Sequence, residues 1–201
     1  MPTLKWSVLI VLLLAGCAAS DVRLGQRLFA GCVKAVDDAA TLKKGEFVCK
    51  GALDPAPFSG NGRSCGSCHM PGDNFSISVT RIAALNPNHP LFFRGLDEDQ
   101  ELLRKFALFH VVVPTIDEFR QTPKLTHLRD LCTEEGRCDG LGLRGDRIED
   151  LGAFTLQAIA NHLSKTTARV PGQDFRIPTD KELKAITAYQ LSSLVADQDE
   201  R

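Results

Sequence analysis

The sequence lacks an excess of charge of either sign. Its 201 residues include 24 basic and 25 acidic side chains, which gives a formal net charge of −1, and no basic stripe runs along the chain. Proteins that bind nucleic acid usually carry clustered positive charge, so we expect no nucleic-acid partner. Hydrophobic residues make up 43% of the chain and charged residues 24%. This balance predicts a packed globular core rather than a disordered chain.

A long apolar run is also missing. The most apolar segment, WSVLIVLLLAG, begins after Lys5 and ends before Cys17. It is too short to span a membrane, which takes about 20 apolar residues, and is typical of a signal peptide. Its end, LAGC, resembles the bacterial lipobox, in which the cysteine is lipidated and becomes the new N-terminus. The resemblance implies a lipoprotein signal peptide at residues 1–16 and a mature domain at residues 17–201.

The lipobox resemblance implies where the protein resides. Lipidation of Cys17 would anchor the domain to a membrane of the bacterial cell envelope, on the periplasmic side. By resemblance to lipoprotein sorting rules, Ala rather than Asp at position 18 favours the outer membrane. A plain secretory signal peptide, with an incidental cysteine at position 17, is the alternative.

Export places the cysteines in an oxidising compartment, where disulfides form. Besides Cys17 and the two cysteines of the motif discussed next, the chain has Cys32, Cys49, Cys132 and Cys138. Local pairing, Cys32 with Cys49 and Cys132 with Cys138, closes two short loops and adds about 2 to 3 kcal/mol for each disulfide. The other two pairings of these four cysteines remain open.

Residues 61–70, NGRSCGSCHM, bring two thiols and an imidazole close together. Cys65 and Cys68 have the spacing C-x-x-C, and His69 follows directly, which is the attachment motif of a c-type haem. The thiols add to the two vinyl groups, and the imidazole ligates the iron from the proximal face. A thioredoxin-like dithiol needs a βαβ pattern and a zinc site needs a second Cys/His pair nearby, and the sequence has neither. We expect one covalent haem c.

Methionine is scarce, and this limits the choice of a second axial ligand. An electron-transfer haem is normally held on both faces, by a methionine or a second histidine as the distal ligand. The chain has only Met1 and Met70. Met1 leaves with the signal peptide, and Met70 follows the proximal histidine too closely to reach the opposite face. The distal ligand is therefore expected among the remaining histidines, His89, His110, His127 and His162.

His162 is the preferred distal ligand. In LGAFTLQAIANHL, helical spacing places it on an apolar face with Phe154 and Ile159. A histidine in such a place is usually a hydrogen-bonded core residue, but the lack of a usable methionine favours ligation here. His127, in TPKLTHL, is the second choice. The other two histidines are more simply interpreted as loop and helix-end residues.

Helical periodicity dominates the rest of the chain. Apolar positions recur at helical spacing, and Thr179 is a candidate N-cap. The expected helices cover residues 21–42, 78–85, 97–110, 151–164 and 178–196. Residues 111–150 are expected to be rich in loops. No internal repeat or interdomain linker is visible, so we predict one mainly α domain with long loops.

The two terminal helices resemble those of class I cytochromes c. The segment GQRLF, residues 25–29, looks like the Gly-x-x-x-Phe element of their N-terminal helix. In that family the N- and C-terminal helices cross. The resemblance implies that Gly25 permits a close approach and that Phe29 meets an aromatic residue such as Tyr189. Two unrelated amphipathic helices are the alternative.

Residues 60–195 resemble a second haem family. RQTPKLTHL, the later TLQAIANHL and the loop NGRSCGSCH look like the C-terminal, electron-transfer haem domain of bacterial dihaem cytochrome c peroxidases and MauG-like proteins. In that family the distal ligand, usually methionine, lies one helical turn beyond a Gln-Ala pair, which implies His162 here. The chain has one C-x-x-C-H motif rather than two, and LGLRGDRIEDL replaces the family's Phe-His-Asp-Gly turn. Peroxidase activity is therefore not implied.

The sequence predicts a lipid-anchored, monohaem c-type cytochrome that transfers single electrons between redox partner proteins. His69 and His162 would ligate the iron. Arg63 is a candidate for contact with a haem propionate, although an ordinary loop or surface residue is the simpler interpretation. Histidine in place of methionine predicts a reduction potential below that of ordinary cytochrome c. An electron carrier is favoured over a catalyst. The alternatives are a peroxidase-like oxidoreductase with a substrate-accessible haem and a haem subunit of a larger redox complex.

Overall fold

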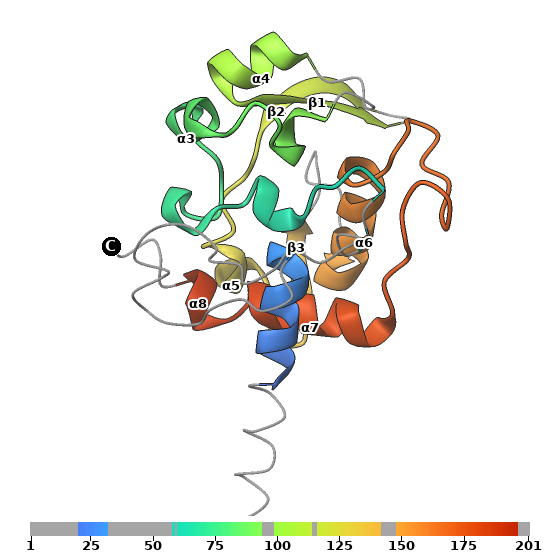
Figure 1. The fold of residues 1–201 in the computed structure, drawn as a ribbon. Helices are drawn as coiled ribbons and strands as arrows, with labels where there is room; N and C mark the ends of the chain where they lie inside the picture. The colour runs from blue at the N-terminus through green and yellow to red at the C-terminus, as the bar shows by residue number, and fades with distance from the viewer. Residues whose placement is uncertain are drawn as a thin grey trace, which may run out of the picture.

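A computed structural model describes residues 20–31, 58, 60–93, 99–113, 116–141 and 148–196. The signal peptide, Cys17, Cys32 and Cys49 lie outside these residues. In Figure 1 the terminal helices form the lower part of the molecule, and a β-hairpin with short helices forms the upper part. Within the described part of the chain, no helix is both long and apolar enough to cross a membrane.

The described elements are short helices and short strands. An N-terminal helix covers residues 20–30. The other helices are α3 (Val79–Ala84), α4 (Gln100–Phe106), α5 (Leu128–Leu131), α6 (Leu151–His162), α7 (Asp180–Gln190) and α8 (Ser193–Ala196), and the 3₁₀ turns are η1 (Cys65–Ser67), η2 (Pro71–Asp73) and η3 (Pro90–Phe92). The antiparallel pairs are β1 (Leu108–Val113) with β2 (Ile116–Gln121) and β3 (Arg137–Leu141) with β4 (Ile148–Asp150). The fold is therefore mixed with substantial helix, and the expectation of a mainly α domain is corrected.

The strands occupy a region that we expected to hold a helix end and loops. Helix α4 begins after Asp99, whose carboxylate accepts hydrogen bonds from the N–H groups of Glu101 and Leu102, and it ends at Ala107, which has a φ of +53°. Strand β1 starts at the next residue. The β-branched run Val111–Val113 favours an extended chain. The prediction of a helix to residue 110 is therefore wrong beyond residue 106.

Helices α6 and α7 begin close to the predicted positions, at strong N-caps. The helix predicted over residues 178–196 is interrupted, because α7 ends at Gln190 and α8 begins at Ser193. Asp150 accepts a hydrogen bond from the N–H of Ala153 at the start of α6 (2.7 Å). At the start of α7, Thr179 and Glu182 form a reciprocal capping box. Each cap satisfies N–H groups that have no partner inside the helix. Helix α6 ends at His162, which is the predicted distal ligand.

The N-terminal helix crosses α7 at Gly25. A Cβ atom on Gly25 would lie 1.9 Å from the carbonyl oxygen of Ala185 and 2.8 Å from the Cβ of Tyr189, so only glycine fits. The rings of Phe29 and Tyr189 pack edge to face, with centroids 5.3 Å apart. The predicted close approach at Gly25 and the predicted aromatic contact are both confirmed.

The buried apolar side chains form two clusters. The first lies among the N-terminal helix, α6, α7 and α8 and includes Phe29, Ile159 and Tyr189. The second lies in the upper part of the molecule and consists of Ile77, Ile82, Leu91, Phe92, Leu103, Ala107 and Phe109. Cys65 packs against the first cluster, whereas Cys68 packs against the second. The C-x-x-C-H motif therefore lies at the boundary between the two clusters.

Candidate functional site

The C-x-x-C-H motif folds into a single helical turn. Before η1, the N–H of Ser64 donates to the Oγ of Ser67, and the N–H of Ser67 donates to the carbonyl of Ser64 (both 3.0 Å). The N–H groups of Cys68 and His69 donate to the carbonyl of Cys65 at 3.2 and 2.9 Å. These bonds hold both thiols and the imidazole on one short turn.

The ring of His69 is oriented by the backbone of Phe75. Its Nδ1–H donates to the carbonyl oxygen of Phe75 at 2.6 Å, which leaves the lone pair on Nε2. Burial lowers the pKa of His69 to about 4, against the opposing effect of hydrogen bonding to the carbonyls of Phe75 and Pro123. A metal-binding histidine typically has one ring nitrogen fixed in this way while the other binds the metal.

The two cysteines of the motif lack the properties of a redox dithiol. Neither Cys65 nor Cys68 belongs to a disulfide. Burial raises the pKa of the Cys65 thiol to about 12. Reactive cysteines in redox C-x-x-C motifs have a lowered pKa instead. The turn therefore lacks the activated thiolate that thiol–disulfide exchange requires.

The fold brings His162 close to His69. Burial lowers the pKa of His162 to about 4, and the charges of Arg63, His69 and Arg169 lower it further. The side-chain amide of Asn61 donates to the carbonyl of His162 at 2.9 Å, so the end of α6 lies against the loop that leads to His69. Both rings are neutral near pH 7, which is the form of imidazole that binds metals.

The other candidate ligands are used elsewhere. His127, the second choice, has a side chain that is 58% exposed and lies 3.6 Å from Asp130. The Nε2 of His110 lies 2.7 Å from a carboxylate oxygen of Asp117 on the β1–β2 hairpin. His89 is the N-cap of η3. This arrangement favours His162 over the other three histidines.

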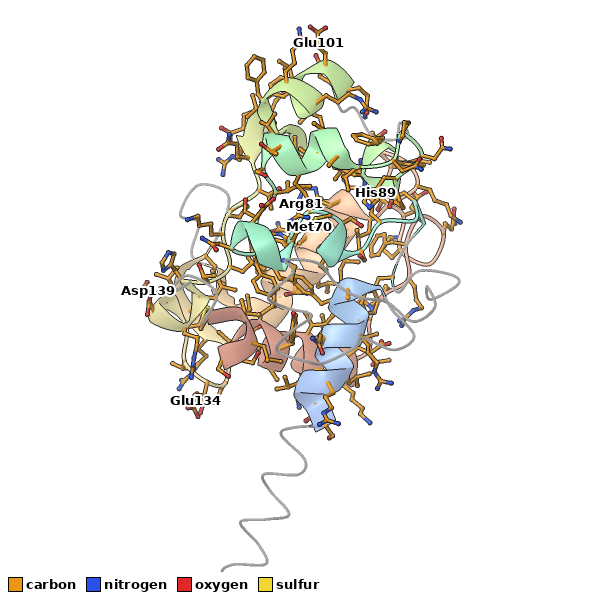
Figure 2. All side chains as sticks on the ribbon, turned by 60° about the vertical axis from the view of Figure 1, so that its left-hand side comes forward. Met70, Arg81, His89, Glu101, Glu134 and Asp139 are labelled. Carbon is orange, nitrogen blue, oxygen red and sulfur yellow. A yellow bond between two sulfur atoms is a disulfide. The ribbon has the colours of Figure 1, made fainter. Side chains whose placement is uncertain are left out.

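Met70 packs rather than pointing towards the opposite side of the site. Its N–H donates to the carbonyl of Ser76 at 2.8 Å, and its side chain contacts the second cluster together with Cys68. Figure 2 shows Met70 in the middle of the molecule, below Arg81. The prediction that Met70 serves packing is confirmed.

Arg63 is almost completely buried, with 1% of its surface exposed. Its Nε donates to the carbonyl of Pro90 at 3.2 Å. One terminal nitrogen lies 2.6 Å from the carbonyl oxygen of Leu91 and 3.4 Å from that of Phe93. These bonds fix η3 to the haem-motif loop, which is the segment 60–69 that carries Cys65, Cys68 and His69. The sequence pointed to a role against a propionate and gave no sign of this bridge between the loop and the second cluster.

Gly60 and Asn61 tie the same loop to the end of α6, and sequence reasoning missed both. The side-chain amide of Asn61 donates to the carbonyls of His162 (2.9 Å) and Ser164 (3.0 Å). The N–H of Gly60 donates to the carbonyl of Leu163 at 3.0 Å. No sequence signal reveals such a pairing, because the partners are about 100 positions apart.

These residues fit a covalent haem. Two cysteines outside disulfides and a fixed imidazole share one turn, and a second neutral imidazole lies nearby. Cys65, Cys68, His69 and His162 all keep some accessible surface, although burial dominates the pKa shifts of both histidines. Within the described ranges, no group of three or more His, Cys, Asp or Glu is arranged to hold a bare metal ion.

The remaining predicted site residues are cysteines. Cys132 and Cys138 form a disulfide, which is the local pairing, with Cα atoms 3.9 Å apart. It joins the end of α5 to β3, at the lower edge of the molecule rather than at the histidine pair. Cys32 and Cys49, and the lipidation residue Cys17, lie outside the described residues.

Comparisons with protein-family models, with curated proteins and with solved structures find no match for this chain. The features of the chain that bear on function are the turn with Cys65, Cys68 and His69, and the hydrogen bond from Asn61 that joins the loop before this turn to His162.

Proposed function

We propose that the protein is a monohaem c-type cytochrome that transfers single electrons. Cys65 and Cys68 would hold the haem through thioether bonds, His69 would be the proximal ligand and His162 the distal one. The observation that carries this proposal is the C-x-x-C-H turn, on which the Nδ1–H of His69 donates to Phe75, together with the bond from Asn61 that joins the preceding loop to His162 at the end of α6.

The haem would supply the one-electron couple of its iron, and the protein would supply position and surroundings. The bond from His69 to Phe75 fixes the plane of the proximal imidazole. Phe29 lies beside that ring, with centroids 6.1 Å apart, and helps to exclude water. His69 and His162 would together hold the haem iron without a free position for a substrate, which would favour electron transfer over catalysis.

We further propose that this domain is held at the periplasmic side of the cell envelope by lipidation of Cys17. The lipobox-like sequence LAGC supports this anchor. The reaction partners would be redox proteins that exchange electrons with the haem. The proposal agrees with the resemblance to the electron-transfer domain of dihaem peroxidases. The single C-x-x-C-H motif would attach one haem, so the peroxide-binding haem of that family has no counterpart here.

Covalent haem attachment is the first test. The chain should be produced in a bacterium with cytochrome c maturation machinery, and haem should be measured by pyridine haemochrome and intact mass. We expect one haem per chain, lost in the double variant Cys65→Ser/Cys68→Ser. A colourless wild-type protein without added mass would overturn the proposal.

Axial ligation is the second test. We expect a ferric low-spin spectrum of the bis-histidine type by paramagnetic resonance and near-infrared spectroscopy. His162→Met should replace it with a His/Met spectrum and raise the reduction potential, while His127→Ala should change neither. An unchanged spectrum in His162→Met, with loss of the signal in His127→Ala, would reassign the distal ligand. Rapid carbon monoxide binding by the wild type would favour the peroxidase-like alternative.

A further inference from the structure

We propose that Asn61 is a positioning residue for the distal ligand: it fixes His162 relative to the loop that carries Cys65, Cys68 and His69. The inference rests on the proposed function, because it assumes that His162 binds the haem iron. The role belongs to a side chain whose amide donates to backbone carbonyls at the end of α6.

The carbonyl groups at the end of α6 are bound by the loop that precedes Cys65. The last carbonyl groups of a helix have no partner inside the helix and need one from elsewhere. Here the carbonyls of His162, Leu163 and Ser164 accept hydrogen bonds from Asn61, Gly60 and Asn61, in that order. Three consecutive carbonyls are therefore satisfied by two consecutive residues of the haem-motif loop.

The amide of Asn61 is held in one orientation. Asn61 is buried, with 7% of its surface exposed, and its Oδ1 accepts a hydrogen bond from the N–H of Arg63 at 3.0 Å. Because the oxygen faces Arg63, the nitrogen faces the helix end. A leucine at this position would keep the size of the side chain but would lose all three hydrogen bonds.

The neighbouring glycine keeps the approach close. A Cβ atom on Gly60 would lie 1.9 Å from the carbonyl oxygen of Asp174 and 2.4 Å from the Cγ of Lys165. The segment after α6 thus folds directly over the loop. Its own turn is closed by the N–H of Lys165, which donates to the carbonyl of Asp174 at 3.0 Å. The loop has no space in which to slide relative to the helix end.

The consequence concerns the iron. His69 follows Asn61 by eight positions in one continuous loop, and His162 is bound to Asn61 through its carbonyl. Asn61 therefore sets the position of the distal imidazole relative to the proximal one. Without the hydrogen bonds from Asn61, the last turn of α6 would move more freely. The proposed bond between His162 and the haem iron would then break more often.

The test uses the haem-loaded wild-type protein, Asn61→Leu and Asn61→Asp. The readouts are the high-spin fraction of the ferric protein and the rate at which the ferrous protein binds carbon monoxide. We expect both to rise about tenfold in Asn61→Leu, since two hydrogen bonds to the helix end are lost. We expect a larger rise in Asn61→Asp, because a carboxylate would face two carbonyl oxygens. Should the leucine variant fail to accumulate, Asn61→Ser is measured in its place.

Gln190→Leu is the matched control. Gln190 is also a buried amide, and it accepts a hydrogen bond from Thr155 at 3.2 Å between α7 and α6, away from the end of α6. This variant should lower the melting temperature and leave the spin state unchanged. An unchanged spin state and carbon monoxide rate in the Asn61 variants would overturn the inference, as would an equal response in Gln190→Leu. A wild-type chain without covalent haem would overturn the proposed function itself.

Discussion

Glu182 shows how one side chain can support several parts of the fold. Its carboxylate accepts hydrogen bonds from both terminal nitrogens of Arg176, at 2.8 and 2.9 Å. It also accepts bonds from the N–H and the Oγ1 of Thr179, at 2.8 and 3.0 Å. The hydrogen bonds from Arg176 are the main reason that the pKa of Glu182 falls from 4.5 to about 2. The residue therefore caps α7 and fixes the segment before it.

The lowered pKa predicts how stability depends on pH. The carboxylate is bound more tightly in the folded chain than in the unfolded one, so it stabilises the fold above pH 4.5 and loses this effect as the pH falls towards 2. We expect Glu182→Gln to lower the free energy of unfolding at neutral pH by about 1 kcal/mol. Urea unfolding between pH 7 and pH 2 measures the difference.

A suitable control for Glu182→Gln is Glu101→Gln. Glu101 forms an exposed pair with Lys105 on one face of α4, and such pairs contribute little. Its effect should be near zero throughout the pH range. A deficit in Glu182→Gln that persists unchanged below the folded-state pKa would contradict the role assigned to the carboxylate.

At the scale of the elements, the crossing at Gly25 makes a sharp prediction. A methyl group there would overlap the carbonyl of Ala185 in α7. Overpacking of this kind typically costs about 1 to 3 kcal/mol, so Gly25→Ala should lower the free energy of unfolding by that amount. Gly152→Ala is the control, because its Cβ would lie 3.1 Å from a carboxylate oxygen of Asp150 and at ordinary contact distances of 3.8 and 3.9 Å from Thr187 and Leu183. Equal losses in the two variants, measured by denaturant unfolding, would argue against a tight crossing.

The hairpin with the disulfide is a second element with a testable role. Gly136, at a φ of +84°, lies against Thr187 of α7, and its carbonyl accepts a hydrogen bond from the N–H of Leu151 at 2.8 Å. The Cys132–Cys138 bridge closes a short loop around this contact, which is worth about 2 kcal/mol. We expect Cys132→Ser/Cys138→Ser to lower the melting temperature and to leave the haem spectrum unchanged. A changed spectrum would place the bridge nearer the haem than the structure does.

The elements also show how much could be predicted from the sequence. Caps such as Thr179 and the periodicity around Ile159 are local signals, so α6 and α7 were predicted well. The crossing at Gly25 and the contact of Phe29 were implied by the resemblance of GQRLF to class I cytochromes c, not by a local pattern alone. The strands were missed, since the apolar residues before Val111 also match a helical period. The contacts of Asn61 and Arg63 are long-range, and no local pattern encodes them.

At the scale of the whole molecule, the two apolar clusters predict uneven stability. Helices α6 and α7 contribute to the first cluster, whereas α4 and β1 belong to the second, smaller one. Small clusters with exposed hairpins open at lower free energy than large ones. We expect amide hydrogen exchange to be faster in β1 and α4 than in α6 and α7.

Variants in the two clusters test this division. Leu103 and Leu151 are both fully buried, the first in the second cluster and the second in the first. Each substitution to alanine should cost about 2 to 5 kcal/mol. Leu103→Ala should accelerate exchange mainly in the upper part, and Leu151→Ala throughout the molecule. Uniform acceleration by both variants would indicate a single cooperative unit.

The bond from Asn61 to the end of α6 has a consequence for the order of assembly. It closes a loop of 101 residues, and contacts this distant form late because the chain must first lose much conformational freedom. If the chain is exported and carries haem as proposed, the turn with Cys65, Cys68 and His69 would leave the membrane before residue 162, and the bond from Asn61 would form only after both had emerged.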